Sequence, residues 1–170
     1  MSKIEELKKQ MQELDKQRLE LQHELELEEK KTETEIEYLF KDNERYWLIT
    51  ASGQIESFTW SNQKFDTDRY SQGHLFKTEQ EAEKERDKRI LLTRFRQFRD
   101  KCNGDWKPDF NDMETNKYYV AYSYLWDKLC CFAAMFNTDF RLFGYFKNED
   151  DAKCAIELFG DEIKRLWVDE

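Results

Sequence analysis

The amino-acid sequence predicts an α+β protein made of an N-terminal coiled-coil helix and two repeated units, each a three-stranded antiparallel sheet followed by a helix. Three observations lead to this fold class. Residues 2–39 contain neither proline nor glycine. The segment that begins at Phe76 recurs seventy residues later at Phe146, and short apolar runs separated by turn residues precede both copies. The expected organisation is a coiled-coil helix at 1–40, a first unit at 41–103, a connector at 104–117 and a second unit at 118–170.

The N-terminal helix carries an apolar stripe at coiled-coil spacing. Glutamate, leucine, lysine and glutamine dominate this segment, and all four favour helix. Ser2 followed by Glu5 has the spacing of a capping box. The stripe alternates steps of three and four residues over about three heptads, and includes one arginine that costs stability but can set the register: Ile4, Leu7, Met11, Leu14, Arg18, Leu21 and Leu25. Ile36 and Leu39 resume the stripe and are expected to dock onto the globular region.

A helix this polar cannot remain folded by itself without burying its stripe, so we expect a second copy of the chain to pair with it. In a parallel pair Lys3 would face Lys8, and Glu24 would face Glu29, and both contacts are repulsive. An antiparallel pair places Lys3 near Glu24 and Lys8 near Asp15. The charges therefore favour an antiparallel homodimer, and the alternative is a helix that packs on its own domain.

The globular region is predicted to contain one unit twice. In each copy an N-cap residue, Thr78 or Asn148, begins a helix with acidic residues in its first turn. The expected strands are 46–50, 55–60 and 74–77 in the first unit, with a loop or short helical turn at 66–70, and 118–122, 129–135 and 141–147 in the second. The expected helices are 79–102, 149–159 and a short last helix at 161–168 that follows Gly160, a C′ glycine.

Each helix is expected to cover the sheet of its own unit, because a three-stranded sheet with one apolar face needs a cover. The covering residues of the first helix are Ala82, Leu91, Phe95, Phe98 and Cys102. Those of the second are Ala152, Ala155, Ile156 and Phe159. The connector holds Pro108, the one proline of the chain, and marks the boundary between the units.

One set of residues resembles a family. The pattern consists of Tyr46-Trp47, Gly53, Trp60, Asp66, Arg69-Tyr70, Gly73, Phe76 and Thr78-Glu79, continued by the segment 106–112 and by Lys117-Tyr118-Tyr119. It resembles uncharacterised accessory proteins of bacteriophages and prophages of Gram-positive bacteria, over about residues 46–166. The shared positions are turns, caps and core aromatics rather than catalytic residues. The resemblance implies a phage accessory protein, a class whose small members often bind and inhibit host defence machinery.

Overall composition excludes some classes of function. Of the 170 residues 38% are charged and 15% are aromatic, which indicates an aromatic core joined to a very polar segment, since disordered chains lack large side chains. The net charge of −9 disfavours nonspecific binding to nucleic acid or anionic membranes. No apolar run approaches the length of a membrane span or a signal peptide. We therefore expect a cytoplasmic protein of the host cell with no membrane partner.

Candidate chemistry is sparse. The four cysteines form no C-x-x-C pair, and the adjacent Cys130 and Cys131 have poor geometry for a disulfide or a tetrahedral zinc site. A nucleophilic pair of His74 with one of these thiols is conceivable, but no motif surrounds it, and buried reduced thiols explain the pattern better. Asp66 and Asp68 lack the glycine and distal glutamate of a calcium loop. We expect no catalytic residue, no metal, no cofactor and no enzymatic activity.

The charge pattern offers two opposite binding hypotheses. Between Lys84 and Lys101 eight basic residues stand against three acids, so this helix could contact phosphates or an acidic protein surface. Alternatively its arginines pair with the acidic N-terminal helix, or flank the core face and cover apolar surface with their stems. The acidic N-terminal helix could instead mimic nucleic acid in a basic groove, but Lys30 and Lys31 interrupt the acidic run and favour an ordinary solvated face.

The sequence thus predicts a non-catalytic binding protein that occupies the surface of a host protein or protein–nucleic acid complex, with an anti-CRISPR or other anti-defence inhibitor as the concrete form. The alternative is a phage accessory factor that binds nucleic acid through helix 84–101. Tryptophan and arginine dominate interface hot spots, and the candidate partner-binding residues are Arg89, Arg94, Arg96, Arg99, Trp106 and Trp126. The candidate dimerisation residues are the seven of the N-terminal stripe.

Overall fold

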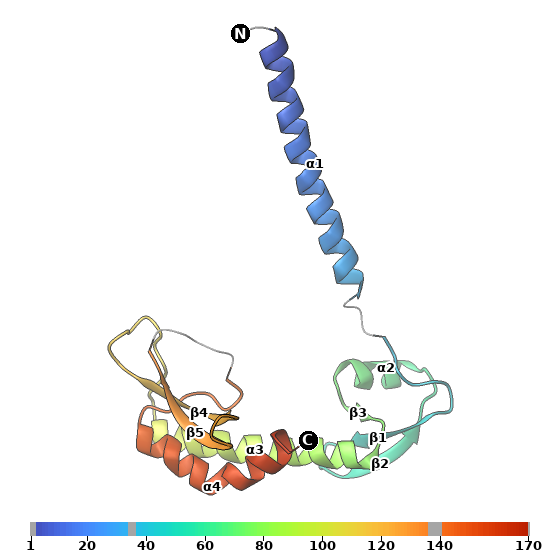
Figure 1. Cartoon of the computed structure of the whole chain (residues 1–170). Helices are drawn as coiled ribbons and strands as arrows, with labels where there is room; N and C mark the ends of the chain where they lie inside the picture. The colour runs from blue at the N-terminus through green and yellow to red at the C-terminus, as the bar shows by residue number, and fades with distance from the viewer. Residues whose placement is uncertain (1–2, 34–36, 136–140, 170) are drawn as a thin grey trace.

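The computed structural model describes residues 3–33, 37–135 and 141–169 (Figure 1). Along these residues the elements follow in the order α1 Lys3–Glu33, β1 Arg45–Ile49, β2 Ile55–Thr59, α2 Lys64–Ser71, β3 Leu75–Phe76, α3 Glu79–Asn103, β4 Lys117–Ser123, β5 Lys128–Ala134 and α4 Glu149–Trp167. The strands pair in antiparallel fashion, as one sheet of three and one of two. The predicted α+β class with a long N-terminal helix is confirmed.

Helix α1 stands clear of the other elements in Figure 1, and its apolar stripe is exposed throughout. Two predictions at its ends, the cap at Ser2 and the docking of Ile36, fall outside the described residues. The predicted docking of Leu39 is wrong, because its side chain is 59% exposed. The adjacent Phe40 is buried instead. The chain therefore joins the globular core one residue after Leu39, the position that the heptad spacing predicted. No helix in the described ranges is long and apolar enough to cross a membrane.

The first sheet has the strand order β2-β1-β3, with Trp47 of β1 opposite both Ser57 and Phe76. Its core is a cluster of aromatic rings rather than an aliphatic layer. Phe40 lies 5.7 Å from the ring of Trp60 and 5.8 Å from that of Tyr46, measured between centroids. The segment before β1 therefore completes the core of this sheet, a role that the sequence had assigned to the following helix.

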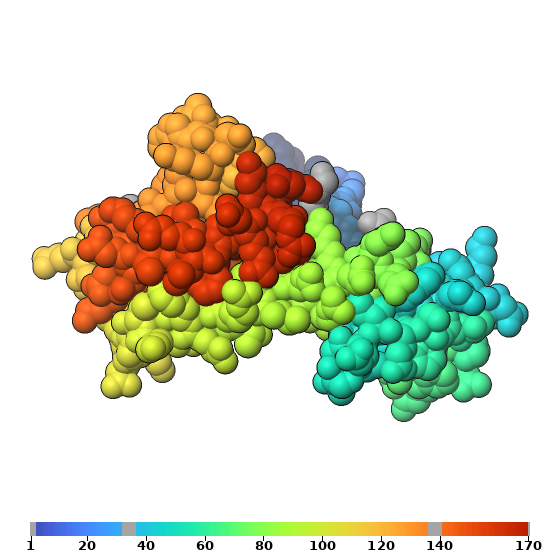
Figure 2. Space-filling model, turned by 90° about the horizontal axis from the view of Figure 1, so that it is seen from below, coloured from blue at the N-terminus to red at the C-terminus, as the bar shows by residue number. Residues whose placement is uncertain are grey.

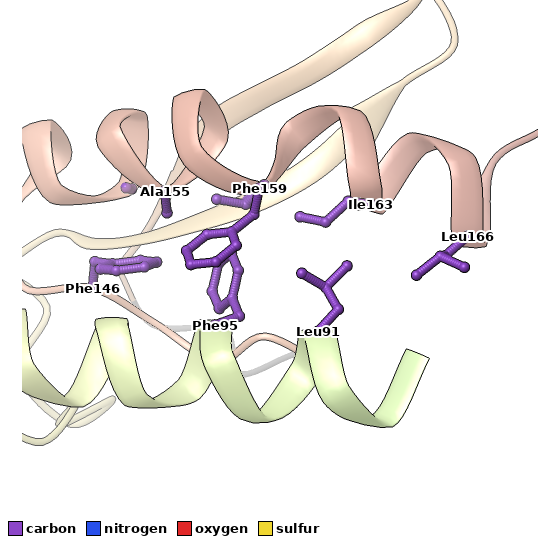
Figure 3. Packing of buried hydrophobic residues seen from close by; sticks show 9 residues of the cluster. Leu91, Phe95, Phe146, Ala155, Phe159, Ile163 and Leu166 are labelled. Atoms are coloured by element: carbon purple, nitrogen blue, oxygen red, sulfur yellow. The ribbon is translucent and has the colours of Figure 1, made fainter. Parts of the chain in front are cut away.

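The prediction that each helix covers only the sheet of its own unit is wrong for α3. Near its N-terminus α3 contacts β1, β2 and β3, and Ala82 is fully buried there. The larger apolar residues of the stripe all join the core of the second unit instead: Leu91, Phe95, Phe98 and Cys102. They meet the stripe of α4, so the two helices pack side by side (Figures 2 and 3). One long helix thus serves both sheets in turn.

The second unit is not a copy of the first. Its sheet has two strands, β4 and β5, and the predicted third strand at 141–147 is wrong. What remains of it is a single bridge, in which Tyr118 and Phe146 exchange backbone hydrogen bonds of 2.7 and 2.9 Å. The reason is a turn, closed by the bond from the Gly144 amide to the Arg141 carbonyl. Gly144 has a φ of +71°, which interrupts an extended run and leaves too few residues before the helix.

Helix α4 is continuous, so the predicted break at Gly160 and the separate helix at 161–168 are wrong. Its buried residues Ala152, Ala155, Phe159, Ile163 and Leu166 form one stripe that continues past the glycine. Figure 3 shows the side chains of Ala155, Phe159, Ile163 and Leu166 on the side of α4 that faces α3, where Leu91 and Phe95 lie. Packing along this stripe outweighs the cost of a glycine within a helix, about 1 kcal/mol.

Both predicted N-caps begin a helix, but only one makes the expected bonds. Thr78 forms a full capping box: its hydroxyl accepts from the Glu81 amide at 3.2 Å, and the Glu81 carboxylate accepts from the Thr78 amide at 3.1 Å. Asn148 makes no side-chain cap bond to the backbone. Its amide group donates to the Asp151 carboxylate at 2.9 Å instead, so the two helix starts differ in detail.

Candidate interaction surfaces

The predicted dimerisation stripe is an exposed apolar face of α1. Its six apolar side chains retain between 56% of their surface, at Leu7, and 66%, at Met11. Arg18 occupies its gap in the stripe and is exposed as well. The polar faces carry ordinary surface pairs such as Lys16 with Glu20 at 3.8 Å. A row of large apolar side chains in solvent over three heptads is typical of an interaction surface rather than of a monomer face.

The four candidate arginines of α3 do not form one open basic face. Arg89 bonds Glu85 at 2.8 Å, and Arg94 bonds Glu162 of α4 at 2.8 Å. Arg99 donates to the Phe143 carbonyl at 3.0 Å and also pairs with its neighbour Asp100. Arg96 points to solvent. Three of the four guanidinium groups therefore have carboxylate partners, all of them on the globular region and none on α1.

Trp106 lies half-buried in a pocket of about 420 Å³ at the C-terminal end of α3. The pocket also contains Arg99, Asn103 and Tyr145. Asn103 closes one side, because its amide donates to the Tyr145 carbonyl at 2.8 Å and its oxygen accepts from the Lys147 amide at 2.9 Å. Trp106 is thus a member of a concave junction between the connector and the second unit, rather than a free loop residue.

Trp126 lies in the turn at the tip of the β4–β5 hairpin, among exposed large side chains. It is 58% exposed, and its neighbours Tyr124 and Leu125 are more than 80% exposed. Figure 2 shows the hairpin, in orange, projecting past α4, in red. A turn closes the tip: the Trp126 amide donates to the Ser123 carbonyl at 3.2 Å, and a hydrogen bond to Asp127 raises the pKa of Tyr122 to about 12.

A row of aromatic rings extends from this tip along the outer face of the hairpin. It was not predicted from the sequence. Trp126 stacks on Phe132 at 6.5 Å with 16° between the ring planes, and Phe132 stacks on Tyr119 at 5.7 Å. The guanidinium of Arg141 lies 4.0 Å from the Tyr119 ring centroid. The sequence pattern does not reveal this surface, because both faces of β4 carry apolar residues and such a strand shows no alternation between apolar and polar residues.

Asp66 is a buried carboxylate with a structural role. It accepts hydrogen bonds from the Tyr46 hydroxyl at 2.7 Å, the Ser61 amide at 3.0 Å and the Ser61 hydroxyl at 2.8 Å. Burial by itself would raise the pKa of Asp66, but these bonds outweigh it and lower that pKa. Burial, and then the Asp66 contact, raise the pKa of Tyr46 to about 12. The group ties α2 to β1 rather than facing a ligand.

The thiols and histidines do not assemble into a reactive site. Burial raises the pKa of Cys102 and of Cys131, which keeps both as thiols at neutral pH. His23 is exposed on α1, and His74 lies just before β3. Within residues 3–33, 37–135 and 141–169 no three histidine, cysteine, aspartate or glutamate side chains converge as metal ligands would.

Comparison with protein-family models, with curated proteins and with solved structures finds no match to this chain. The fold and the surfaces define an α+β protein with an exposed apolar stripe on its N-terminal helix and an aromatic hairpin on its globular region. Both features are of the kind that contact other macromolecules.

Proposed function

We propose that this chain is a non-catalytic binding protein that forms an antiparallel homodimer through α1 and inhibits a host defence protein on behalf of a bacteriophage. The dimer rests on the exposed stripe of α1. The role against host defence rests on the resemblance of residues 46–166 to phage accessory proteins. An inhibitor of a CRISPR nuclease is the concrete form of the proposal.

The exposed stripe is the single observation that carries the proposed dimer. Full burial of a leucine or isoleucine side chain contributes about 1.5–3 kcal/mol, and more than half of each stripe residue remains in solvent. A second copy is the occupant that best fits the stripe, because its own heptads supply knobs and holes of matching spacing. Helix α1 stands clear of the other described elements in Figure 1, so none of them covers the stripe.

The flanking charges select the direction of the pair. With Met11 opposite Leu14 of the second copy, the residues beside the seam meet as Lys3 with Glu24 and as Lys8 with Asp15. Both contacts are attractive, and both would become repulsive or neutral in a parallel pair. Opposite charges at these positions set partner orientation in coiled coils.

A zero-length carbodiimide cross-linker, which joins a lysine directly to a carboxylate, tests the direction. Lys3 and Glu24 lie about 30 Å apart within one helix, at 1.5 Å per residue, so a bond between them must join two chains. We expect this link in the mass spectrum of the dimer band. A dimer band with no Lys3–Glu24 link would refute the antiparallel arrangement, and no dimer band at all would refute the self-association.

The hairpin tip is the surface that we assign to the host partner. Trp126, Tyr124 and Leu125 present three large side chains on a closed turn, so little conformational entropy is lost when they are buried. The stacked Phe132 supports the Trp126 ring from behind. A dimer carries two such tips, and binding through both raises the apparent affinity without new contacts.

Plating of a phage on a strain whose CRISPR system targets it tests the function. Expression of the full chain should raise the efficiency of plating towards that of a strain without the CRISPR system. The Trp126→Ala variant should lose this protection, whereas Leu19→Ala, which changes an exposed leucine of α1 outside the stripe, should retain it. Plating that stays restricted with the unmodified protein would contradict the anti-CRISPR proposal.

The second candidate function, nucleic-acid binding through helix 84–101, is favoured by Arg96, which remains open to solvent. The ion pairs of Arg89 and Arg94 with Glu85 and Glu162 weigh against it, because paired arginines release fewer counterions from a phosphate backbone. A gel shift at low salt that weakens steeply as salt rises, and that is lost in Arg96→Ala, would favour this function. Absence of a shift at low salt would exclude it.

A further inference from the structure

A second concave site lies on the first unit, apart from the aromatic hairpin. A pocket of about 470 Å³ opens between the first sheet, α2 and the N-terminal half of α3. Leu48 and Phe58 form its apolar floor, and three basic side chains from three different segments reach it: Arg69 of α2, His74 before β3 and Arg89 of α3. These three residues are separated by up to twenty positions in the chain, so the fold alone brings them together.

Aromatic rings hold Arg69 in place. Its guanidinium carbon lies 5.7 Å from the centroid of the Phe58 ring and 5.4 Å from that of Phe65, and the group also makes a hydrogen bond to the Tyr46 phenol. No carboxylate of the described chain forms an ion pair with Arg69. An arginine stacked on rings keeps the donors at its edge available for a planar oxyanion.

Two hydrogen bonds orient the Arg89 side chain on the opposite wall of the pocket. They use its Nε and Nη2 atoms and leave Nη1 without a partner among these contacts. Its Nε donates to Glu85 at 2.8 Å, and its Nη2 approaches the Gly73 carbonyl at 3.4 Å. The Nη1 group remains to bind a ligand. Since both contacts lie outside the pocket lining, they orient the guanidinium without filling the pocket. His74 lies in the same lining and can supply a third donor through a ring N–H.

Charge distribution indicates the kind of ligand. The chain has a net charge of −9, yet two arginines and a histidine line this pocket with one carboxylate, Glu56 of the exposed strand β2, while Glu85 pairs with Arg89 from outside the lining. We propose that the pocket binds an oxyanion, a carboxylate or a phosphate group, attached to an apolar body that lies on Leu48 and Phe58. The proposal is independent of the function in host defence, which uses other surfaces.

The two histidines of the chain permit a direct test with the intact protein. His74 lines the pocket, whereas His23 on α1 serves as an internal control. Phenyl phosphate, benzoate and inorganic phosphate are titrated at constant pH and ionic strength while the imidazole proton resonances are followed by NMR, with His23→Gln to assign the peaks. We expect the His74 signal to move and saturate with phenyl phosphate or benzoate and the His23 signal to stay.

The three probes separate the sources of the ligand chemistry. Tighter binding of phenyl phosphate than benzoate identifies a phosphoryl group, and the reverse order identifies a carboxylate. Weaker binding of inorganic phosphate than phenyl phosphate shows that the apolar floor contributes. A His74 signal that moves without saturation and in step with His23 would overturn the proposal.

Matched variants tie the effect to the pocket. Arg69→Gln should weaken the apparent affinity about tenfold or more, because it removes a charge-assisted donor pair. Arg96→Gln removes the same charge from an exposed site outside the pocket and should change the affinity less than about twofold. If Arg69→Gln disturbs the circular dichroism spectrum, Arg89→Gln serves in its place. Equal effects of the pocket variant and Arg96→Gln would also overturn the proposal.

Discussion

The replacement of Leu14 by alanine is a direct test of the α1 dimer. In the proposed antiparallel pair Leu14 lies next to the symmetry axis and faces Met11 of the second copy. Its side chain is 64% exposed in the single chain, so most of its surface is available for burial on association. Alanine is a better helix former than leucine, and α1 should therefore keep its helical content when the contact is removed.

The size of the effect follows from this exposed fraction. Full burial of a leucine side chain contributes about 1.5–3 kcal/mol, and burial of the 64% that is exposed contributes about 1–2 kcal/mol. A symmetric dimer loses two such side chains, which gives a loss of about 2–4 kcal/mol. The dissociation constant should rise by about 30-fold to 700-fold, since 1.4 kcal/mol is a factor of ten.

Sedimentation equilibrium over a range of protein concentrations measures this constant. Leu19→Ala is the matched control, because Leu19 lies on the same helix, is 61% exposed and falls outside the stripe. Its dissociation constant should stay within about threefold of the unmodified protein, as expected for an exposed substitution. Equal effects of the two substitutions, or a monomeric unmodified protein at high concentration, would refute the reasoning.

Three further predictions concern the globular region. Gly160→Ala should raise the free energy of unfolding by about 0.5–1 kcal/mol, measured by urea titration, because the added Cβ meets its neighbours at ordinary van der Waals distance and alanine loses less entropy in a helix. Gly144→Ala should lower it by more than 1 kcal/mol, since φ is +71° and the Cβ would lie 2.3 Å from Nη1 of Arg99; a neutral result would contradict the described turn. The pKa of Tyr46 is raised from 10.0 to about 12, so the unfolded chain loses the phenol proton at a lower pH than the folded chain. The stability that Tyr46 provides is therefore fully present below pH 10 and is lost as the pH rises through 12. Tyr46→Phe should be less stable than the unmodified protein at pH 8, since the Asp66 carboxylate loses a donor, and the difference should shrink at pH 11; a constant difference would refute this linkage.

Local signals in the sequence predicted several elements closely. The helix expected at 79–102 extends over Glu79–Asn103, and the capping box at Thr78 forms as its spacing indicates. The strand expected at 118–122 is β4 at Lys117–Ser123. These features depend on residues three or four positions apart or on adjacent strands of one hairpin, so a single sequence is enough to find them.

The errors share a physical cause. Glycine often follows the last residue of a helix, and Gly160 was predicted to end one. Helix α4 nevertheless continues through it, because Phe159 and Ile163 pack on α3. The segment before Asn148 resembles the segment before Thr78, yet the turn at Gly144 reduces it to a bridge. In both places contacts between residues far apart in the chain outweigh a local preference.

The candidate surfaces also differ in whether local sequence patterns or tertiary contacts define them. The stripe of α1 could be found from the sequence, since it lies on one helix and needs only a spacing of three and four residues. The basic residues of α3 could be counted in the same way, but the ion pair of Arg94 with Glu162 of α4 could not. The ring row on the hairpin and the pocket between α2 and α3 appear only when separate elements are brought together.

The sequence by itself determined the helical N-terminus with its apolar stripe, the capping box of α3 and the antiparallel hairpins, because each depends on residues that are close along the chain. Only the tertiary structure decided that α3 serves two cores, that α4 runs unbroken and that Arg69, His74 and Arg89 meet in one pocket. Burial of apolar surface between distant segments settles such questions, because its free energy exceeds the local preferences of single residues.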